Sequence, residues 1–276
     1  MTKARIEARF AQLKQEDRAA FVAYVMSGDP DAETAAKILK GLPAAGADLI
    51  ELGFPFSDPM AEGPPIQRAA QRALAKGQTL KGVLAQAQAF REGDQTTPII
   101  LMGYMNPLVT WGFTAFARAA AAAGIDGLIV VDCPPEEATP LADALDAADI
   151  ALIRLATPTS DDARLQVIVR RTAGFVYYVS VAGVTGVKEA DADAVAPAVA
   201  RVRAASGLPV AVGFGIKTPE RAAAIARVAD AAVVGSALVE EVAAALERNE
   251  DVTGRVLSKV EALAKAVRGA RAAEPA

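Results

Sequence analysis

Short apolar runs recur along the chain, and longer segments that mix alanine with charged residues separate them. The runs span residues 21–26, 48–52, 98–102, 127–132, 150–155, 175–180, 209–214 and 231–235. Strands that are covered on both faces are apolar almost throughout, whereas half-exposed strands alternate apolar and polar residues. The pattern therefore predicts eight buried strands of a parallel sheet.

Helix start signals and Ala-rich stretches fill the intervals between these strands. We predict helices over residues 31–45, 161–171 and 191–205. Thr218-Pro219-Glu220 supplies an N-cap, a proline at the first helical position and a first-turn acid, and Pro134-Pro135-Glu136-Glu137 predicts a similar start. Eight strand–helix units in about 250 residues are typical of a closed (β/α)8 TIM barrel. An open, doubly wound sheet remains the alternative, because strand count does not prove closure.

Two intervals are longer than a single crossover helix needs. One follows the second strand and includes residues 56–65, and the other follows the sixth strand at residues 182–188. Both fall on the side of a barrel where active sites lie. We expect one α/β barrel domain over residues 1–268, with an extra N-terminal helix, extended loops after strands 2 and 6, and a frayed tail at residues 269–276.

Composition narrows the possible functions. The formal net charge is −4 with both signs spread along the chain, which does not favour nucleic-acid binding. No apolar segment approaches the length of a membrane span, and the first residues lack the apolar run of a signal peptide. A single cysteine cannot form an intrachain disulfide, so we expect a cytoplasmic protein without membrane partners. Histidine is absent, which excludes histidine metal sites and leaves proton transfer to carboxylates, tyrosine, lysine or cysteine.

Glu51 is a lone acid in an otherwise apolar strand, where it shares one face with Leu49. A carboxylate in that place costs free energy unless it is paired or functional. Glu62 is a second acid near the same mouth, and the two could divide proton transfer and substrate binding between them. The structural alternatives are a Glu51 paired with a buried cation and a Glu62 at an exposed helix start.

Glycine clusters follow the last three predicted strands. They are Gly183-Val184-Thr185-Gly186, Gly213-Phe214-Gly215-Ile216 and Gly235-Ser236-Ala237. Glycine lets backbone amides approach an anion closely, and barrels often bind phosphate between the loops after strands 7 and 8. Tyr177, Asp132 and Tyr104-Met105-Asn106-Pro107 are on the same rim, although core packing, capping and turns explain them as well.

In this order, the motifs resemble those of the alpha subunit of tryptophan synthase over nearly the full length of the chain. The matching segments are residues 51–59 (ELGFPFSDP), Ala61-Glu62-Gly63-Pro64 and the three glycine clusters. The resemblance implies a lyase of tryptophan biosynthesis. Its reaction would be the retro-aldol cleavage of indole-3-glycerol phosphate to indole and glyceraldehyde 3-phosphate.

The resemblance also implies the residues of the site. Glu51 would be the catalytic acid–base residue, Glu62 would bind the indole N–H where the family usually has an aspartate, and Tyr177 would lie beside Glu51. The implied substrate-binding residues are Tyr24, Met102, Ile129, Thr185, Gly186, Phe214, Gly215, Gly235 and Ser236.

A beta subunit that carries pyridoxal phosphate (PLP) is the implied partner, in an alpha-beta-beta-alpha heterotetramer. No cofactor or metal is expected in this chain itself. The implied interface comprises Asp58, Pro59, Asn106, Pro107 and Asp132. Two other functions stay open at this stage: another phosphate-binding barrel isomerase or decarboxylase, and a weakly active subunit that mainly activates its beta partner.

Overall fold

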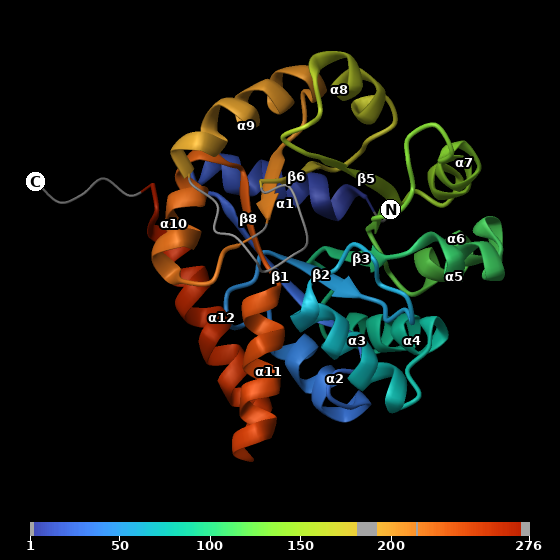
Figure 1. Cartoon of the computed structure of the whole chain (residues 1–276), viewed down its shortest axis with the longest axis vertical. Coiled ribbons are helices and arrows are strands. Elements are labelled where there is room, and N and C mark those ends of the chain that lie inside the picture. Colours follow the sequence, from blue (N-terminus) through green and yellow to red (C-terminus); the bar gives the residue numbers. More distant parts are fainter. Residues whose placement is uncertain (1–2, 181–191, 214, 272–276) are drawn as a thin grey trace, which may run out of the picture.

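The computed structural model describes residues 3–180, 192–213 and 215–271, and its eight parallel strands close into a barrel (Figure 1). The strands pair in chain order, and β1 pairs with both β2 and β8. The predicted (β/α)8 barrel is therefore confirmed, and the open-sheet alternative is wrong. The strands are β1 (Ala20–Met26), β2 (Leu49–Gly53), β3 (Ile99–Gly103), β4 (Gly127–Val130), β5 (Ala151–Ala156), β6 (Val176–Val179), β7 (Val210–Gly213) and β8 (Ala231–Val234).

Helices surround the barrel, and one of them covers the end at which the strands begin. The buried face of α1 (Ile6, Phe10 and Leu13) packs into the cluster that fills the barrel interior, so α1 covers the N-terminal ends of the strands. This is the predicted extra helix, and it leaves the opposite end for a site. Within the described residues the helices are α1 (Ala4–Gln15), α2 (Ala32–Gly41), α3 (Pro64–Ala75), α4 (Leu80–Arg91), α5 (Met105–Trp111), α6 (Phe113–Ala122), α7 (Thr139–Ala147), α8 (Asp162–Val169), α9 (Ala192–Ser206), α10 (Pro219–Val228), α11 (Ser236–Arg248) and α12 (Val252–Gly269).

Alternate residues of each strand face the barrel interior and the helices. On β5, Ile153 packs in the interior cluster and Leu152 packs in the outer cluster with the helices. Both faces are covered, which is why the strands are apolar almost throughout. Leu49 belongs to the interior cluster, so Glu51, two residues later on β2, also faces the interior.

Helix boundaries confirm some of the sequence predictions and correct one. The long interval after β2 holds two helices, α3 and α4. Thr218 caps α10 as predicted, since its hydroxyl accepts the Arg221 N–H at 3.3 Å. The predicted helix start at residues 134–137 is wrong, because α7 begins only at Thr139. Pro135 disfavours helical backbone at Pro134, and the Glu137 N–H donates to the Pro134 carbonyl at 3.1 Å in a turn.

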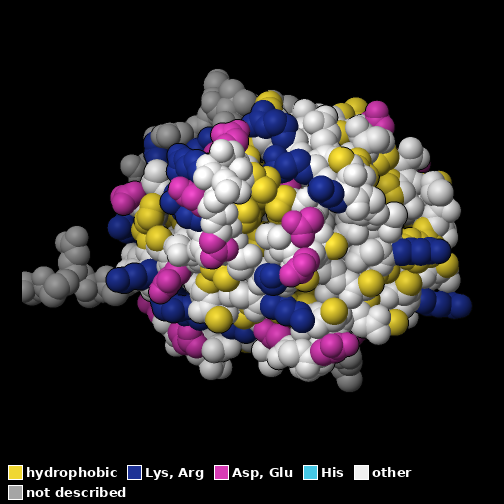
Figure 2. Space-filling view, turned by 90° about the horizontal axis from the view of Figure 1, so that it is seen from below, with side chains coloured by type: hydrophobic (Ala, Val, Ile, Leu, Met, Phe, Trp, Pro, Cys, Tyr) yellow, Lys and Arg dark blue, Asp and Glu magenta, His cyan; other side chains and the backbone are white. Residues whose placement is uncertain are grey.

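The C-terminal helix α12 packs against α2, α10 and α11. Beyond its end the Arg271 guanidinium donates to the carbonyls of Ala226 and Ala229 at 3.0 and 2.7 Å. Residues 272–276 of the predicted tail lie outside the described residues. Basic and acidic side chains are interspersed over the face shown in Figure 2. In the described part of the chain, no helix is both long and apolar enough to cross a membrane.

Candidate active site

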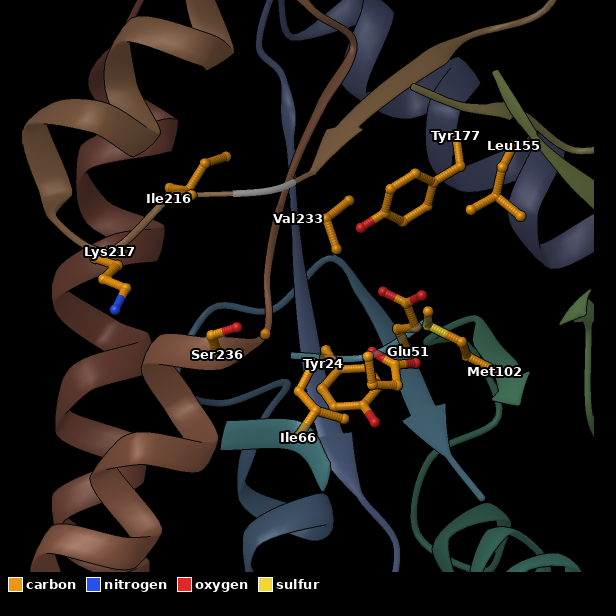
Figure 3. A pocket seen from close by; sticks show the side chains of 13 residues that line it. Tyr24, Glu51, Ile66, Met102, Leu155, Tyr177, Ile216, Lys217, Val233 and Ser236 are labelled. Carbon is orange, nitrogen blue, oxygen red and sulfur yellow. The ribbon is translucent and has the colours of Figure 1, made fainter. Parts of the chain in front are cut away.

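Glu51 projects from β2 into a cavity at the open end of the barrel (Figure 3). The residue is 1% exposed, and neither of its carboxylate oxygens has a hydrogen-bond partner among the described residues. Among the described residues, neither a buried cation nor a backbone donor holds Glu51, as the structural alternative would require. A buried acid without partners is the arrangement expected of a group that awaits a substrate.

Glu62 reaches the same cavity from the loop between β2 and α3. The Glu62 N–H donates to the Pro59 carbonyl at 3.1 Å, and the Glu62 carbonyl accepts the Gln67 side-chain amide at 2.9 Å. These bonds fix the backbone just before Gly63, the N-cap of α3. The Glu62 residue is 4% exposed, and no described group is hydrogen-bonded to its Oε2. Glu62 therefore precedes a helix, as one alternative held, but its side chain is buried rather than solvated.

The two glutamates titrate near neutral pH. Burial, and to a smaller extent the charge of nearby Glu62, raises the pKa of Glu51 from 4.5 to about 8. Burial also raises the pKa of Glu62 from 4.5 to about 7. Near neutrality the cavity thus contains carboxylic acid and carboxylate together, which is the condition for general acid–base catalysis.

Two buried tyrosines complete the wall around the glutamates. Tyr24 and Tyr177 line the cavity from β1 and β6, and burial together with the two glutamate charges raises both phenol pKa values well above 10.0. Both phenols therefore remain hydrogen-bond donors. A methyl group built on Gly213 would overlap the Tyr177 hydroxyl, so this glycine makes room for the phenol. Gly53 does the same for Tyr24.

Backbone groups that suit an anion lie on another side of the cavity. Gly215, Gly235 and Ser236 line it together with the glutamates. Gly215 has a φ of +71°, a conformation that favours glycine. Ser236 is the first residue of the 13-residue helix α11, whose free N-terminal amides favour an anion. Lys217 is close by, with its Nζ 3.1 Å from the Glu240 carboxylate.

Two of the five other predicted binding residues can be placed. Met102 lines the cavity, whereas Ile129 is completely buried in the interior cluster. Thr185, Gly186 and Phe214 lie outside the described residues. The sequence prediction missed the apolar lining residues Ile66, Leu155 and Val233. The inward position of the last two, near the ends of their strands, was the available signal. Within the described ranges no group of three or more Asp, Glu, His and Cys side chains could hold a metal ion.

The five predicted interface residues come from the loop after β2, the start of α5 and the loop after β4, and hydrogen bonds join these three segments. The Tyr104 hydroxyl accepts the Ala61 N–H at 3.0 Å, which joins the loops after β2 and β3. The Asp132 carboxylate accepts the Met105 N–H at 2.8 Å, which joins the loop after β4 to the start of α5. Met60 on the loop after β2 and Val109 on α5 are 77% and 56% exposed, and the sequence analysis did not single them out.

Comparisons with known proteins agree with this geometry. A family model described as the tryptophan synthase alpha chain matches residues 10–268. The tryptophan synthase alpha chain of Phenylobacterium zucineum is 80% identical over 271 residues, which cover 98% of each chain, and that of Caulobacter vibrioides strain NA1000 / CB15N is 72% identical over the same share. The crystal structure of tryptophan synthase subunit alpha from Legionella pneumophila strain Paris superimposes with a TM-score of 0.89 at 39% identity, covering 95% of this chain and 98% of that one.

Proposed function

The chain belongs to the tryptophan synthase alpha chain family, and we propose that its two buried glutamates carry out the family's reaction. That reaction is the retro-aldol cleavage of indole-3-glycerol phosphate to indole and glyceraldehyde 3-phosphate, in tryptophan biosynthesis. The observation that carries the proposal is the presence of Glu51 and Glu62, both buried and incompletely paired, in one cavity with Gly215, Gly235 and Ser236.

Glu51 acts in both proton-transfer steps. Cleavage requires a proton at C3 of the indole ring and loss of a proton from the hydroxyl group next to the breaking bond. With a pKa of about 8, Glu51 holds a proton near neutral pH and donates it to C3. The carboxylate then accepts the hydroxyl proton, the carbon–carbon bond breaks to form the aldehyde, and its electrons return to the indole ring. The acid is regenerated at the end of the cycle.

Glu62 stabilises the charged intermediate. Protonation at C3 places positive charge on the indole nitrogen, and a carboxylate that accepts its N–H lowers the energy of that state. The pKa of Glu62, about 7, is below that of Glu51, so Glu62 is the more readily ionised of the two. Tyr177 supports the cycle as a neutral donor to the Glu51 carboxylate after Glu51 has lost its proton.

We assign the phosphate of the substrate to Gly215, Gly235 and Ser236, together with Gly186, which lies outside the described residues. Support comes from the positive φ of Gly215 and the N-terminal amides of α11. A side chain at Gly215 would obstruct the phosphate oxygens. A Gly215→Val variant with unchanged affinity for glycerol 3-phosphate would contradict this assignment.

Membership in an alpha chain family implies a beta-subunit partner. We propose that this partner, which would carry the PLP, binds the mouth surface formed by Asp58, Pro59, Asn106, Pro107 and Asp132. The contacts between the three segments and the exposed Met60 and Val109 support this placement. The alpha-beta-beta-alpha stoichiometry and the cytoplasmic location stay predictions.

The length of the Glu62 side chain provides a first test. Glu62→Asp restores the residue usual in the family and should retain activity, whereas Glu62→Ala should lower turnover by at least about tenfold, because the indole N–H loses its charged acceptor. Steady-state cleavage of indole-3-glycerol phosphate, followed by indole release, measures both. If the Asp and Ala variants were equally active, Glu62 would have no role at the indole nitrogen.

Addition of a beta subunit tests the proposed function and the interface together. We expect the isolated chain to cleave its substrate slowly and the complex to do so about 5- to 150-fold faster, as a coupling of about 1–3 kcal/mol would produce. Asp58→Ala and Asn106→Ala should reduce the rate of the complex far more than that of the isolated chain. Glu92→Ala is the control, since Glu92 is exposed just before β3, at the end of the barrel that α1 closes.

Equal losses in the isolated chain and the complex would contradict the placement of the interface. A complex that cleaves the substrate no faster than the isolated chain would contradict activation by the partner. Activity that appears only in the complex would favour the remaining alternative, a weakly active subunit whose main role is to activate the beta subunit.

A further inference from the structure

A second cavity, of about 510 Å³, is lined by the ends of β4 and β5, by the loops that follow them and by α8. Residues 130–135 form one wall, residues from 152–160 form another, and Arg164 and Ile168 of α8 contribute to the rest. In Figure 1 this region lies where β5 passes between α7 and α8. Of the described residues around the active-site cavity, Leu155 alone also lines this one. The second cavity therefore is not an extension of the active site.

Arg154 distinguishes this cavity from an ordinary surface hollow. Its neighbours Ile153 and Leu155 face the barrel interior, so Arg154 points outward toward the helices. The residue is 7% exposed, yet among the described residues no carboxylate forms an ion pair with it. The Cys133 thiol is hydrogen-bonded to its guanidinium, the charges of Glu136 and Arg171 also act on it, and burial lowers the pKa of Arg154.

Arg91 shows how this chain treats a buried arginine that serves the fold. Arg91 is 6% exposed, and its guanidinium lies 2.6 Å from the Asp126 carboxylate. It also donates to the carbonyls of Gly124 and Thr97 at 2.9 and 2.7 Å. A buried cation without such partners costs free energy, which an anionic ligand would recover. Arg154 is buried as deeply as Arg91, but among the described residues it has no carboxylate partner equivalent to Asp126.

The remaining polar groups of the cavity suit an oxyanion. Thr157, Thr159 and Ser160 bring hydroxyl groups, and Arg164 adds a second cation. The Arg164 guanidinium binds the Glu136 carboxylate, which ties α8 to the loop after β4. Asp132 is the one acid among the described lining residues, and its carboxylate accepts the Met105 N–H.

We propose that this cavity is a second ligand site, which binds a small phosphate- or carboxylate-bearing metabolite with its oxyanion on Arg154. The planar guanidinium fork matches either oxyanion with two parallel hydrogen bonds. The volume is within the range of small-molecule pockets of about 300–1,000 Å³, so the body of a metabolite fits behind the anion. An acidic side chain of a partner protein would leave much of that space empty.

Cys133 provides a local probe, because it lines the cavity and is the only cysteine of the chain. The experiment measures the rate at which N-ethylmaleimide modifies Cys133 as inorganic phosphate is added, with chloride at matched ionic strength as the reference. If phosphate occupies the site, the rate falls saturably, by about tenfold at ten times Kd, since only the free fraction reacts. A parallel titration with acetate distinguishes a carboxylate site from a phosphate site.

Variants decide whether Arg154 is responsible. Arg154→Met should abolish the protection, and Arg154→Lys, which keeps the charge but loses the fork, should weaken it. Arg248→Gln is the matched control, because Arg248 is exposed at the end of α11, does not line the cavity and should leave the protection intact. Circular dichroism checks that each variant is folded, and Arg154→Lys keeps the test valid if Arg154→Met does not fold.

Three results would overturn the proposal. One is equal slowing by chloride and by both oxyanions. Another is full protection in Arg154→Lys and in folded Arg154→Met. The third is protection that phosphate and acetate fail to produce but an added beta subunit does, which would make the cavity part of a protein interface.

Discussion

Glu51→Gln is expected to lower the rate of indole-3-glycerol phosphate cleavage by at least about a hundredfold while the barrel still folds. The amide occupies nearly the same space on β2 as the carboxyl group, but it cannot donate a proton to C3 or accept one from the substrate hydroxyl. Both steps depend on the same residue. Tyr24 and Tyr177 do not replace it, because they hold their protons far above neutral pH, and Glu62 is engaged at the indole nitrogen in the proposed cycle.

Single-turnover rates of the complex with a beta subunit measure this loss without interference from product release. Binding of glycerol 3-phosphate should persist, since Glu51 lies away from the proposed phosphate groups. Glu247→Gln, which removes an exposed carboxylate on α11, is the matched control and should leave the rate unchanged. A Glu51→Gln enzyme that retained more than about a tenth of the parental rate would remove Glu51 from the acid–base role.

The same residue should make the stability of the protein depend on pH. The pKa of Glu51 is 4.5 when unperturbed and about 8 in the fold. Below about pH 4.5 the Glu51 carboxyl group is protonated in both the folded and unfolded states, so its titration does not lower the free energy of unfolding. Between these two values the unfolded chain has released the proton and the folded chain still holds it, so the free energy of unfolding falls as pH rises. Above about pH 8 the full penalty, about 3–5 kcal/mol, is present.

Glu51→Gln removes this titration, so we expect the variant to gain stability over the parent progressively from pH 5 to about pH 8. Urea unfolding at several pH values measures the difference, and Glu247→Gln again serves as the control. Burying the amide adds a cost that does not depend on pH. It shifts the free energy of unfolding of the variant equally at every pH and leaves the pH dependence of the difference unchanged. A difference between Glu51→Gln and the parent that does not vary with pH would show that Glu51 is not held protonated by the fold.

Local sequence patterns were sufficient to predict the alternation of strands and helices along the chain. The eight apolar runs correspond to the eight strands, and the break of that pattern at Glu51 marked the mouth of the barrel. Thr218-Pro219-Glu220 predicted the start of α10, because capping depends on neighbours a few residues away. The start of α7 was predicted too early, since residues 134–137 have the composition of a first helical turn but form turns after Pro135.

The surroundings of individual polar groups could not be predicted in this way. Glu62 had an exposed helix start as its alternative, and only the packing of its loop against β1 and β3 shows that its carboxylate is buried beside Glu51. Gly213 belonged to a glycine cluster interpreted as phosphate-binding, yet the position of Tyr177 on β6 explains why a side chain is excluded there. Arg154 gave no signal, because a cation within a strand is noticed only when its partners are known.

The sequence alone thus determined the eight strand–helix units, the acid at the mouth and the family resemblance, because these follow from periodicity and from motifs read along the chain. The closure of the strands into a barrel was decided by the tertiary structure. The tertiary structure alone decided which polar groups are buried, which lack partners and which glycines make room for a neighbour. Those properties depend on atoms from residues far apart in the sequence. The pKa values of Glu51 and Glu62, and the burial of Arg154 without an ion-pair partner among the described residues, arise from that packing, and the proposed chemistry and ligand site depend on them.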